Sequence, residues 1–238
     1  MTDTNYKKEF IDFLIESDAL LFGEFMTKSG RKSPYFVNTG KFQTGNQIKK
    51  LGEFYARNII EHMVKGDIDK DIKFLFGPAY KGIPLVIATS IALCDYGMDI
   101  NYCFNRKEEK DHGEGGNLVG YLPKPGDKAL IIEDVITAGT AVREILPVLQ
   151  ELKVDIKGLV VSVDRMEKSN DGITAIQSLY KKEGIPTYPV INLNDIIDEL
   201  YHPDHNDKKI DNDDNTQSVI TEDIYKKLRE YMKQYCIA

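Results

Sequence analysis

The spacing of apolar and polar residues predicts helices and strands that alternate along the middle of the chain. Residues 44–64 repeat apolar positions every three or four residues, which indicates an amphipathic helix with Thr44 or Asn46 as its N-cap. Beyond this helix, short apolar runs of strand length alternate with helical patterns. The predicted strands are 72–77, 99–105, 127–135, 154–165 and 186–192, and the predicted helices between them are 81–97, 138–153 and 172–184.

This alternation predicts the fold class. The runs "LIIEDV" (130–135) and "GLVVSVD" (158–164) are apolar without a clean period of two, as expected for strands that helices cover on both faces. We therefore expect an α/β protein with a doubly wound, mostly parallel sheet.

Both ends of the sequence add elements to this core. Residues 1–43 combine a helical pattern with aromatic-rich stretches interrupted by glycine and proline, which predicts a helix and a small β-hairpin that form a hood. Residues 201–217 are dominated by Asp, Asn, Lys and His and predict a solvated or disordered insertion. Residues 218–238 predict a terminal helix. We expect a single domain over 1–238, with its core at 44–200.

Composition narrows the classes of function. Of the 238 residues, 42% are hydrophobic and 29% are charged, and no apolar run approaches the roughly 20 residues that span a bilayer. We expect a cytoplasmic protein, because the first residues show neither a signal core nor a transit pattern. The net charge of −7 disfavours nucleic acid as a partner, so an anionic ligand requires local cations or helix N-termini. The sequence also disfavours a zinc site. Its three cysteines lack CxxC spacing, and no cysteine or third histidine lies near His202 and His205.

The most specific motif is "ALIIEDVITAGTA" (129–141). A buried strand leads into Glu133 and Asp134, and small residues then precede a helix. Free N–H groups at a helix N-terminus bind anions, and small residues let the backbone approach a phosphate closely. Two carboxylates nearby can accept hydrogen bonds from sugar hydroxyls. The motif therefore predicts a site for a ribose 5-phosphate group.

Three other predicted strands end in residues that suit the same ligand. Tyr80 and Lys81 follow strand 72–77, the charged stretch "NRKEEKDHGEGGNLVG" (105–120) follows strand 99–105, and Arg165 ends strand 154–165. In an open α/β sheet, the ligand crevice lies at the carboxyl ends of the strands. The charged stretch is either a solvated connector or a cationic lid over an anionic substrate, and its neighbours favour the lid.

These motifs resemble those of a known family. "LIIEDVITAGTA" is similar to the phosphoribosyl diphosphate (PRPP) signature of type I phosphoribosyltransferases. "FGEFMTKSGRKSPYFVNTG", "LFGPAYKGIPL" and "CFNRKEEKDHGEGGNLVG" each resemble orotate phosphoribosyltransferases. The resemblance runs from about residue 10 to about residue 200 and implies the type I phosphoribosyltransferase fold. It also implies transfer of the 5-phosphoribosyl group from PRPP to orotate, giving orotidine 5′-monophosphate and diphosphate in de novo pyrimidine (UMP) biosynthesis.

The resemblance further implies roles for individual residues. The catalytic residues would be Lys110, His112 and Asp134. Those implied to bind PRPP are Lys28, Tyr80, Lys81, Arg106, Lys107, Lys110, His112, Glu133, Asp134, Val135, Ile136, Thr137, Ala138, Gly139, Thr140 and Ala141. Those implied to bind orotate are Phe36, Val37, Thr137 and Arg165, with Arg165 forming a forked contact to the orotate carboxylate.

The implied cofactor is Mg²⁺, held mainly by PRPP and water rather than by a cage of protein ligands. The implied assembly is a homodimer in which the loop 106–118 closes over the partner subunit's site. The chain departs from the family pattern in two places. Its acidic pair is Glu-Asp where the family often has Asp-Asp, and the insertion 201–217 with the terminal helix lies outside the resemblance.

Two other functions are compatible with a PRPP site. A regulatory protein of the same fold would bind PRPP or RNA without catalysis, and we would expect it to lack the lysines and histidine of the charged stretch. A transferase for another base would differ at Phe36, Val37 and Arg165. A dinucleotide-dependent dehydrogenase or a P-loop kinase is disfavoured, because the sequence contains neither GxGxxG nor GxxxxGK[ST].

The implied role of Lys110 can be tested by substitution. Lys110→Ala is expected to lower turnover about 10²- to 10³-fold with much less effect on PRPP binding, because charge builds on the departing diphosphate only during the reaction. Steady-state kinetics at varied PRPP measures both quantities. Lys70→Ala, outside all the quoted motifs, serves as the control. Near-normal turnover of the Lys110 variant would contradict the assignment.

Overall fold

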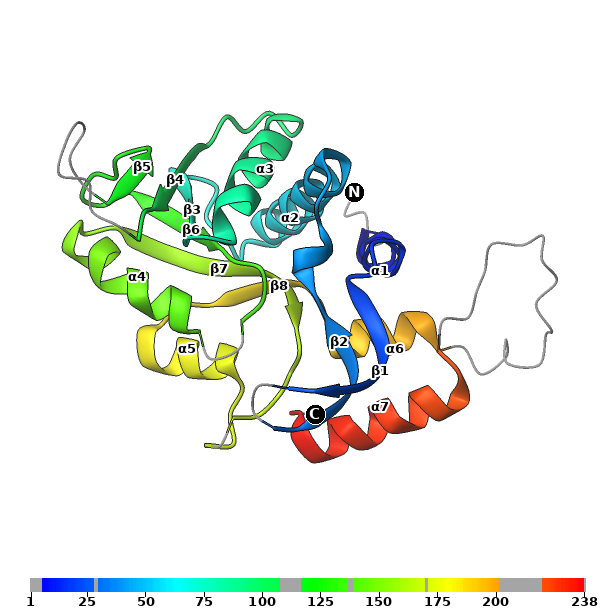
Figure 1. Ribbon diagram of the computed structural model, residues 1–238. Coiled ribbons are helices and arrows are strands. Elements are labelled where there is room, and N and C mark those ends of the chain that lie inside the picture. Colours follow the sequence, from blue (N-terminus) through cyan, green and yellow to red (C-terminus); the bar gives the residue numbers. More distant parts are fainter. Residues whose placement is uncertain are drawn as a thin grey trace. The chain divides into compact units, whose positions relative to one another are not determined.

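The computed structural model describes residues 6–27, 30–107, 117–136, 139–169, 171–201 and 220–237 (Figure 1). The chain divides into two compact units. In the described residues, the first unit comprises Gln43–Asp164 and Ala175–Val190. The second comprises Asp3–Phe42, Arg165–Thr174 and Ile191–Ala238. Apart from Tyr201, the predicted polar insertion lies outside the described residues.

A six-stranded sheet forms the centre of the first unit. Its strands are β3 (Phe74–Gly77), β4 (Asn101–Asn105), β5 (Leu118–Gly120), β6 (Lys128–Ile132), β7 (Asp155–Asp164) and β8 (Thr187–Asn192), in the order β5-β4-β3-β6-β7-β8. Strands β4, β3, β6 and β7 pair in parallel, and β5 is antiparallel to β4. The predicted mostly parallel sheet is thereby confirmed.

Helices cover both faces of this sheet. The helices are α2 (Gly45–Lys65), α3 (Gly82–Cys94), α4 (Thr140–Glu151) and α5 (Ala175–Glu183). Figure 1 shows α2 and α3 over one face and α4 and α5 over the other. Alternate strand residues such as Phe74, Phe76 and Ile131 pack with Ile145 and Leu149 of α4 in one buried cluster. Leu75, Leu130 and Ile132 between them are also buried, which confirms the doubly wound arrangement.

Local sequence explains where α2 begins. The Thr44 hydroxyl accepts a hydrogen bond from the N–H of Gln47 (3.2 Å), and the Gln47 side chain accepts one from the N–H of Thr44 (3.1 Å). This capping box satisfies N–H groups that the first helical turn leaves unpaired. Of the two candidates for the N-cap, Thr44 is therefore the one used.

Strand β6 is shorter than predicted. It ends at Ile132, whereas the sequence pattern extended the strand to Val135. Beyond Ile132 no regular strand continues, although the chain stays beside β7. The N–H of Glu133 donates to Val160 O (3.0 Å), Ser162 donates to Asp134 O, and Val135 forms an isolated bridge with Val163. Glu133 and Asp134 therefore lie in the loop after the strand. Their side chains need not point to opposite faces, as those of adjacent strand residues do.

The second unit combines elements from both ends of the sequence. It contains α1 (Tyr6–Glu16), the antiparallel hairpin β1 (Leu20–Met26) and β2 (Lys32–Val37), a short 3₁₀ turn (Thr39–Lys41), α6 (Leu193–Leu200) and α7 (Glu222–Tyr235). The predicted hairpin and terminal helix are thereby confirmed. Helix α6 was not predicted, although Asn192 and Asp195 form a capping box at its start. Among the described residues, no helix has the length and apolar composition needed to cross a bilayer.

Two glycines bring the start of α3 against the end of β3. A Cβ on Gly77 would lie 2.3 Å from the carbonyl oxygen of Gly82 and 2.7 Å from Cγ1 of Val86. The turn that carries Tyr80 and Lys81 can therefore close only if residue 77 has no side chain.

Gly77→Ala is expected to destabilise the protein by about 1–3 kcal/mol, because the new methyl group must displace backbone rather than a flexible side chain. Urea unfolding measures this change in the free energy of unfolding. Gly45→Ala is the matched control, since a Cβ there meets nothing within 4 Å. Equal stability of the two variants would contradict the close-packing argument.

Candidate active site

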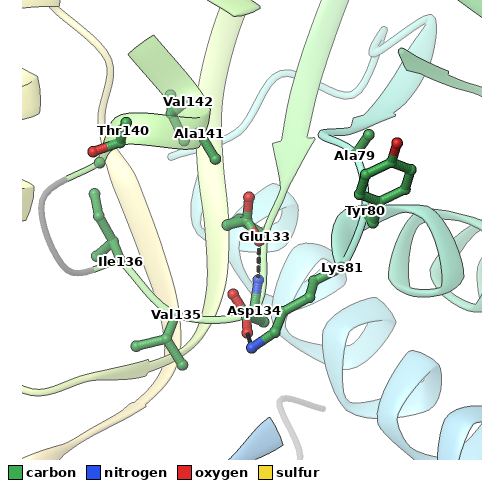
Figure 2. A pocket seen from close by; sticks show the side chains of 11 residues that line it. Ala79, Tyr80, Lys81, Glu133, Asp134, Val135, Ile136, Thr140, Ala141 and Val142 are labelled. Atoms are coloured by element: carbon green, nitrogen blue, oxygen red, sulfur yellow. Dashed lines mark hydrogen bonds and ion pairs between the residues drawn. The ribbon is translucent and has the colours of Figure 1, made fainter. Parts of the chain in front are cut away.

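A pocket lies at the carboxyl ends of β3 and β6 in the first unit. Its lining comes from two segments, the turn after β3 and the loop from β6 into α4 (Figure 2). Its volume is about 230 Å³. The lining residues are Ala79, Tyr80, Lys81, Glu133, Asp134, Val135, Ile136, Gly139, Thr140, Ala141 and Val142. All of them except Ala79 and Val142 were predicted to bind PRPP, so the structure brings this part of the predicted site together.

Hydrogen bonds to the backbone hold the acidic pair in place. The hydroxyl of buried Tyr55 donates to the carbonyl of Glu133 (2.7 Å). The Ser162 hydroxyl donates to the carbonyl of Asp134 (2.6 Å), as does the Ser162 N–H (2.9 Å). The backbone of the loop is thus fixed by α2 and β7, and both acidic residues line the pocket. Tyr55 and Ser162 were not predicted from the sequence. Their local sequence patterns give no sign that they contact Glu133 and Asp134, which lie far from them along the chain.

Lys81 pairs with the acid that lines the pocket. Its Nζ lies 2.8 Å from Oδ2 of Asp134, and Figure 2 shows it reaching across from the start of α3. The side chain of Lys81 is 66% exposed and that of Asp134 is 13% exposed. The cation therefore stands at the open side of the pocket, where an anionic group of a ligand can replace Asp134 as its partner.

Burial changes the protonation of Glu133. This residue is 7% exposed, and its Oε1 accepts a hydrogen bond from the N–H of Asp134 (3.0 Å). Burial raises the pKa of Glu133 to about 8, and the neighbouring Asp134 side chain adds to the increase. Glu133 therefore keeps its proton to a higher pH than an exposed glutamate, and in the protonated form it can donate as well as accept a hydrogen bond.

The start of α4 provides backbone N–H groups. Gly139, at the N-cap position, has φ 68°, in the left-handed region that favours glycine, and no described side chain caps the helix. Thr140, Ala141 and Val142 of the first turn line the pocket. An uncapped first turn presents N–H donors and the positive end of the helix dipole to an anion.

A second cavity of about 310 Å³ lies beside the base of the charged stretch. It is lined by Pro78, Ala79, Asn105, Arg106, Lys107, Ala141, Glu144 and Ile145. Asn105 accepts a hydrogen bond from the N–H of Ala79 (2.8 Å), and Nζ of Lys107 lies 5.6 Å from the centre of the Tyr80 ring. Two predicted PRPP ligands, Arg106 and Lys107, are thereby placed next to the turn that carries Tyr80. Asn105 was not predicted.

The residues predicted to bind orotate lie in the second unit where they are described. Arg165 donates from Nε (2.8 Å) and Nη2 (2.6 Å) to Oε1 of Glu167, a partner that was not predicted. Phe36 is exposed and stacks on Phe25, whereas Val37, the next residue of β2, is buried. Adjacent strand residues point to opposite faces, so Phe36 and Val37 present their side chains in opposite directions.

Five predicted site residues lie outside the described part of the chain: Lys28, Lys110, His112, Thr137 and Ala138. Their assignments remain predictions.

Comparison with known proteins defines the class. A family model described as a phosphoribosyl transferase domain matches residues 38–179, which include both strand ends that form the pocket. The chain belongs to the phosphoribosyltransferase family.

The relatives give its place within that family. The orotate phosphoribosyltransferase of Clostridium beijerinckii is 47% identical over 232 residues, 97% of each chain. That of Bifidobacterium adolescentis is 47% identical over 229 residues, 95% of this chain and 96% of its own. The crystal structure of orotate phosphoribosyltransferase from Francisella tularensis superposes with a TM-score of 0.78 at 37% identity, covering 96% of this chain and all of its own. Within the family, these likenesses place the chain among the orotate phosphoribosyltransferases.

The raised pKa of Glu133 predicts how stability depends on pH. Between the ordinary value of 4.5 and about 8, the folded protein keeps a proton that the unfolded chain loses. The free energy of unfolding therefore falls as pH rises through this window, and Glu133→Gln removes this contribution. Relative to the unsubstituted protein, the variant is expected to gain on the order of 1–3 kcal/mol between pH 5 and pH 8.

Urea unfolding at pH 5, 6.5 and 8 measures the difference between the two proteins. Glu144→Gln, at an exposed position of α4, is the matched control. Parallel pH profiles for the Glu133 variant and the unsubstituted protein would show that burial does not raise this pKa.

Proposed function

We propose that this protein transfers the 5-phosphoribosyl group from PRPP to orotate, producing orotidine 5′-monophosphate and diphosphate in pyrimidine biosynthesis. The observation that carries the proposal is the pocket at the ends of β3 and β6. It combines two carboxyl groups, a lysine and an uncapped helix start in a chain that is 47% identical to an orotate phosphoribosyltransferase over nearly its whole length.

In this proposal the pocket of the first unit binds PRPP. The loop 137–140 and the first turn of α4 take the 5′-phosphate, for which backbone N–H groups and small side chains are suited. Glu133 and Asp134 bind the ribose hydroxyls, and a neutral Glu133 can donate to one hydroxyl oxygen while the Asp134 carboxylate accepts from another. Lys81 leaves Asp134 and pairs with the diphosphate.

The reaction forms a bond from a ring nitrogen of orotate to the anomeric carbon of the ribose, and the bond from that carbon to the diphosphate oxygen breaks. The nitrogen gives up one proton, which balances the proton that the diphosphate gains. Charge therefore builds on the departing diphosphate while the ribose acquires oxocarbenium character. Arg106, Lys107 and Lys110 stabilise the leaving group, and His112 supplies it with a proton. Closure of the loop 106–118 excludes water, which strengthens these interactions.

Mg²⁺ is the proposed cofactor and, when bound, neutralises charge on the PRPP oxygens. The carboxylate of Asp134, which lines the pocket, is an oxygen donor of the kind that Mg²⁺ prefers, and the remaining ligands come from substrate and water. Arg165, Phe36, Val37 and Thr137 bind orotate. We further propose a cytoplasmic homodimer in which each loop 106–118 serves the partner's site.

The substrate is tested by following the loss of orotate absorbance with PRPP and Mg²⁺, with uracil, hypoxanthine and adenine as alternative bases. Orotate alone is expected to be consumed, and only when PRPP is present. Turnover of another base in its place would refute the choice of orotate. Turnover of no base, with PRPP still bound, would favour a regulatory protein.

A pair of variants links the activity to the pocket. Asp134→Asn is expected to lower kcat/KM for PRPP by about 10- to 100-fold, the usual effect of losing a hydrogen bond to a charged group. Asp155→Asn, at an exposed position of β7, is the matched control and should leave kcat/KM unchanged.

A further inference from the structure

The guanidinium of Arg165 is held by a chain of hydrogen bonds that ends on the last helix. Nε and Nη2 of Arg165 both donate to Oε1 of Glu167, at 2.8 and 2.6 Å. The hydroxyl of Tyr231, in α7, donates to the same oxygen at 2.9 Å. A single carboxylate oxygen thus connects Arg165 to the terminal helix. We call Arg165, Glu167 and Tyr231 the arginine clamp.

The clamp lies in a well-packed environment. The side chain of Arg165 is 13% exposed and that of Glu167 is 21% exposed. The guanidinium carbon lies 4.8 Å from the centre of the Tyr35 ring, which is fully buried and meets the ring of Tyr231 edge-on at 6.2 Å. Charged groups this far from water need partners, and Glu167 provides one for Arg165 before any ligand is bound.

The backbone fixes α7 against the segment that carries Arg165. The N–H of Lys168 donates to the carbonyl of Tyr235 (2.8 Å), and the N–H of Ile237 donates to the carbonyl of Met166 (3.0 Å). Glu167 also forms an antiparallel bridge with Cys236. These contacts flank Glu167 on both sides, so the position of Tyr231 relative to Arg165 is set by backbone hydrogen bonds rather than by its side chain alone.

The clamp leaves Nη1 of the guanidinium available to a ligand. Glu167 occupies the edge formed by Nε and Nη2, and Nη1 makes no hydrogen bond to any of the described residues. Nη2 also donates a long hydrogen bond of 3.5 Å to Oγ of Ser33, which a ligand carboxylate would displace. A guanidinium carries five N–H donors in a rigid plane, and the edge formed by Nη1 and Nη2 can bind both oxygens of a carboxylate at once. Because the guanidinium is planar and rigid, holding its Nε–Nη2 edge also sets the direction of its Nη1–Nη2 edge.

We propose that Glu167 and Tyr231 are positioning residues that hold Arg165 with its Nη1–Nη2 edge directed to the carboxylate of the base. This rests on the proposed function, which assigns Arg165 to orotate. The new element is the contribution of α7: a helix that none of the quoted family motifs includes sets the orientation of the residue that recognises the substrate carboxylate.

The test removes a single hydroxyl. Tyr231→Phe is expected to raise KM for orotate about 3- to 10-fold, the effect of losing one hydrogen bond, with kcat and KM for PRPP unchanged within twofold. Tyr235→Phe is the matched control, since Tyr235 lies in the same helix and its hydroxyl makes no hydrogen bond to the described residues. It should leave all three constants unchanged.

A double-substitution cycle separates positioning from general loosening of the structure. In an Arg165→Lys background, where no forked contact can form, Tyr231→Phe should raise KM for orotate less than twofold further. Glu167 supplies an independent pair of variants. Glu167→Ala should raise KM for orotate. Glu167→Gln keeps an acceptor oxygen, so its KM for orotate should lie close to that of the unsubstituted protein.

Three outcomes would overturn the inference: an unchanged KM for orotate in Tyr231→Phe, equal increases in KM for both substrates, or additive effects in the cycle. Failure of the proposed function is a separate result, because it would appear as an unsubstituted protein that does not turn over orotate with PRPP. The unsubstituted enzyme is therefore assayed alongside every variant.

Discussion

The pocket depends on one constraint: helices cover both faces of a short, mostly parallel sheet. Once α2 and α3 pack on one face and α4 and α5 on the other, the strands are closed to a ligand along their length. Their carboxyl ends stay open, and parallel pairing brings these ends to one edge. The residues that follow β3 and β6 can therefore be polar without opposing the core, and Lys81, Glu133 and Asp134 lie there.

The parts of the fold that sequence could predict are those with a strong local signal. The long apolar runs of β6 and β7 and the acidic pair after β6 are visible in the sequence. The start of α2 is visible too, although the sequence left Thr44 and Asn46 as alternative N-caps. Strand β5 has only three residues and takes its conformation from pairing with β4, so no pattern of its own marks it. Contacts such as Tyr55 to Glu133, or Tyr231 to Glu167, join residues far apart in sequence and become visible only in the folded chain.

Glu133 and Asp134 are adjacent in the sequence, but their side chains lie in different environments. Glu133 is buried and has a raised pKa, whereas Asp134 reaches Lys81 at the open side of the pocket. This pairing links two binding events. When a diphosphate draws Lys81 away, Asp134 loses its cation and becomes a better acceptor for a sugar hydroxyl. If Lys81 and Asp134 bind PRPP as proposed, occupation of the diphosphate position would therefore strengthen binding at the ribose position.

The composition of the second unit has a consequence for how the protein is made. Its hairpin comes from the start of the sequence, Arg165 and Glu167 from later, and α7 after all the strands. During synthesis, the strands of the first unit are all made before α7, the helix that packs against β2. The clamp on Arg165 is accordingly assembled last, after the strands and the loop that carries Glu133 and Asp134 have been synthesised.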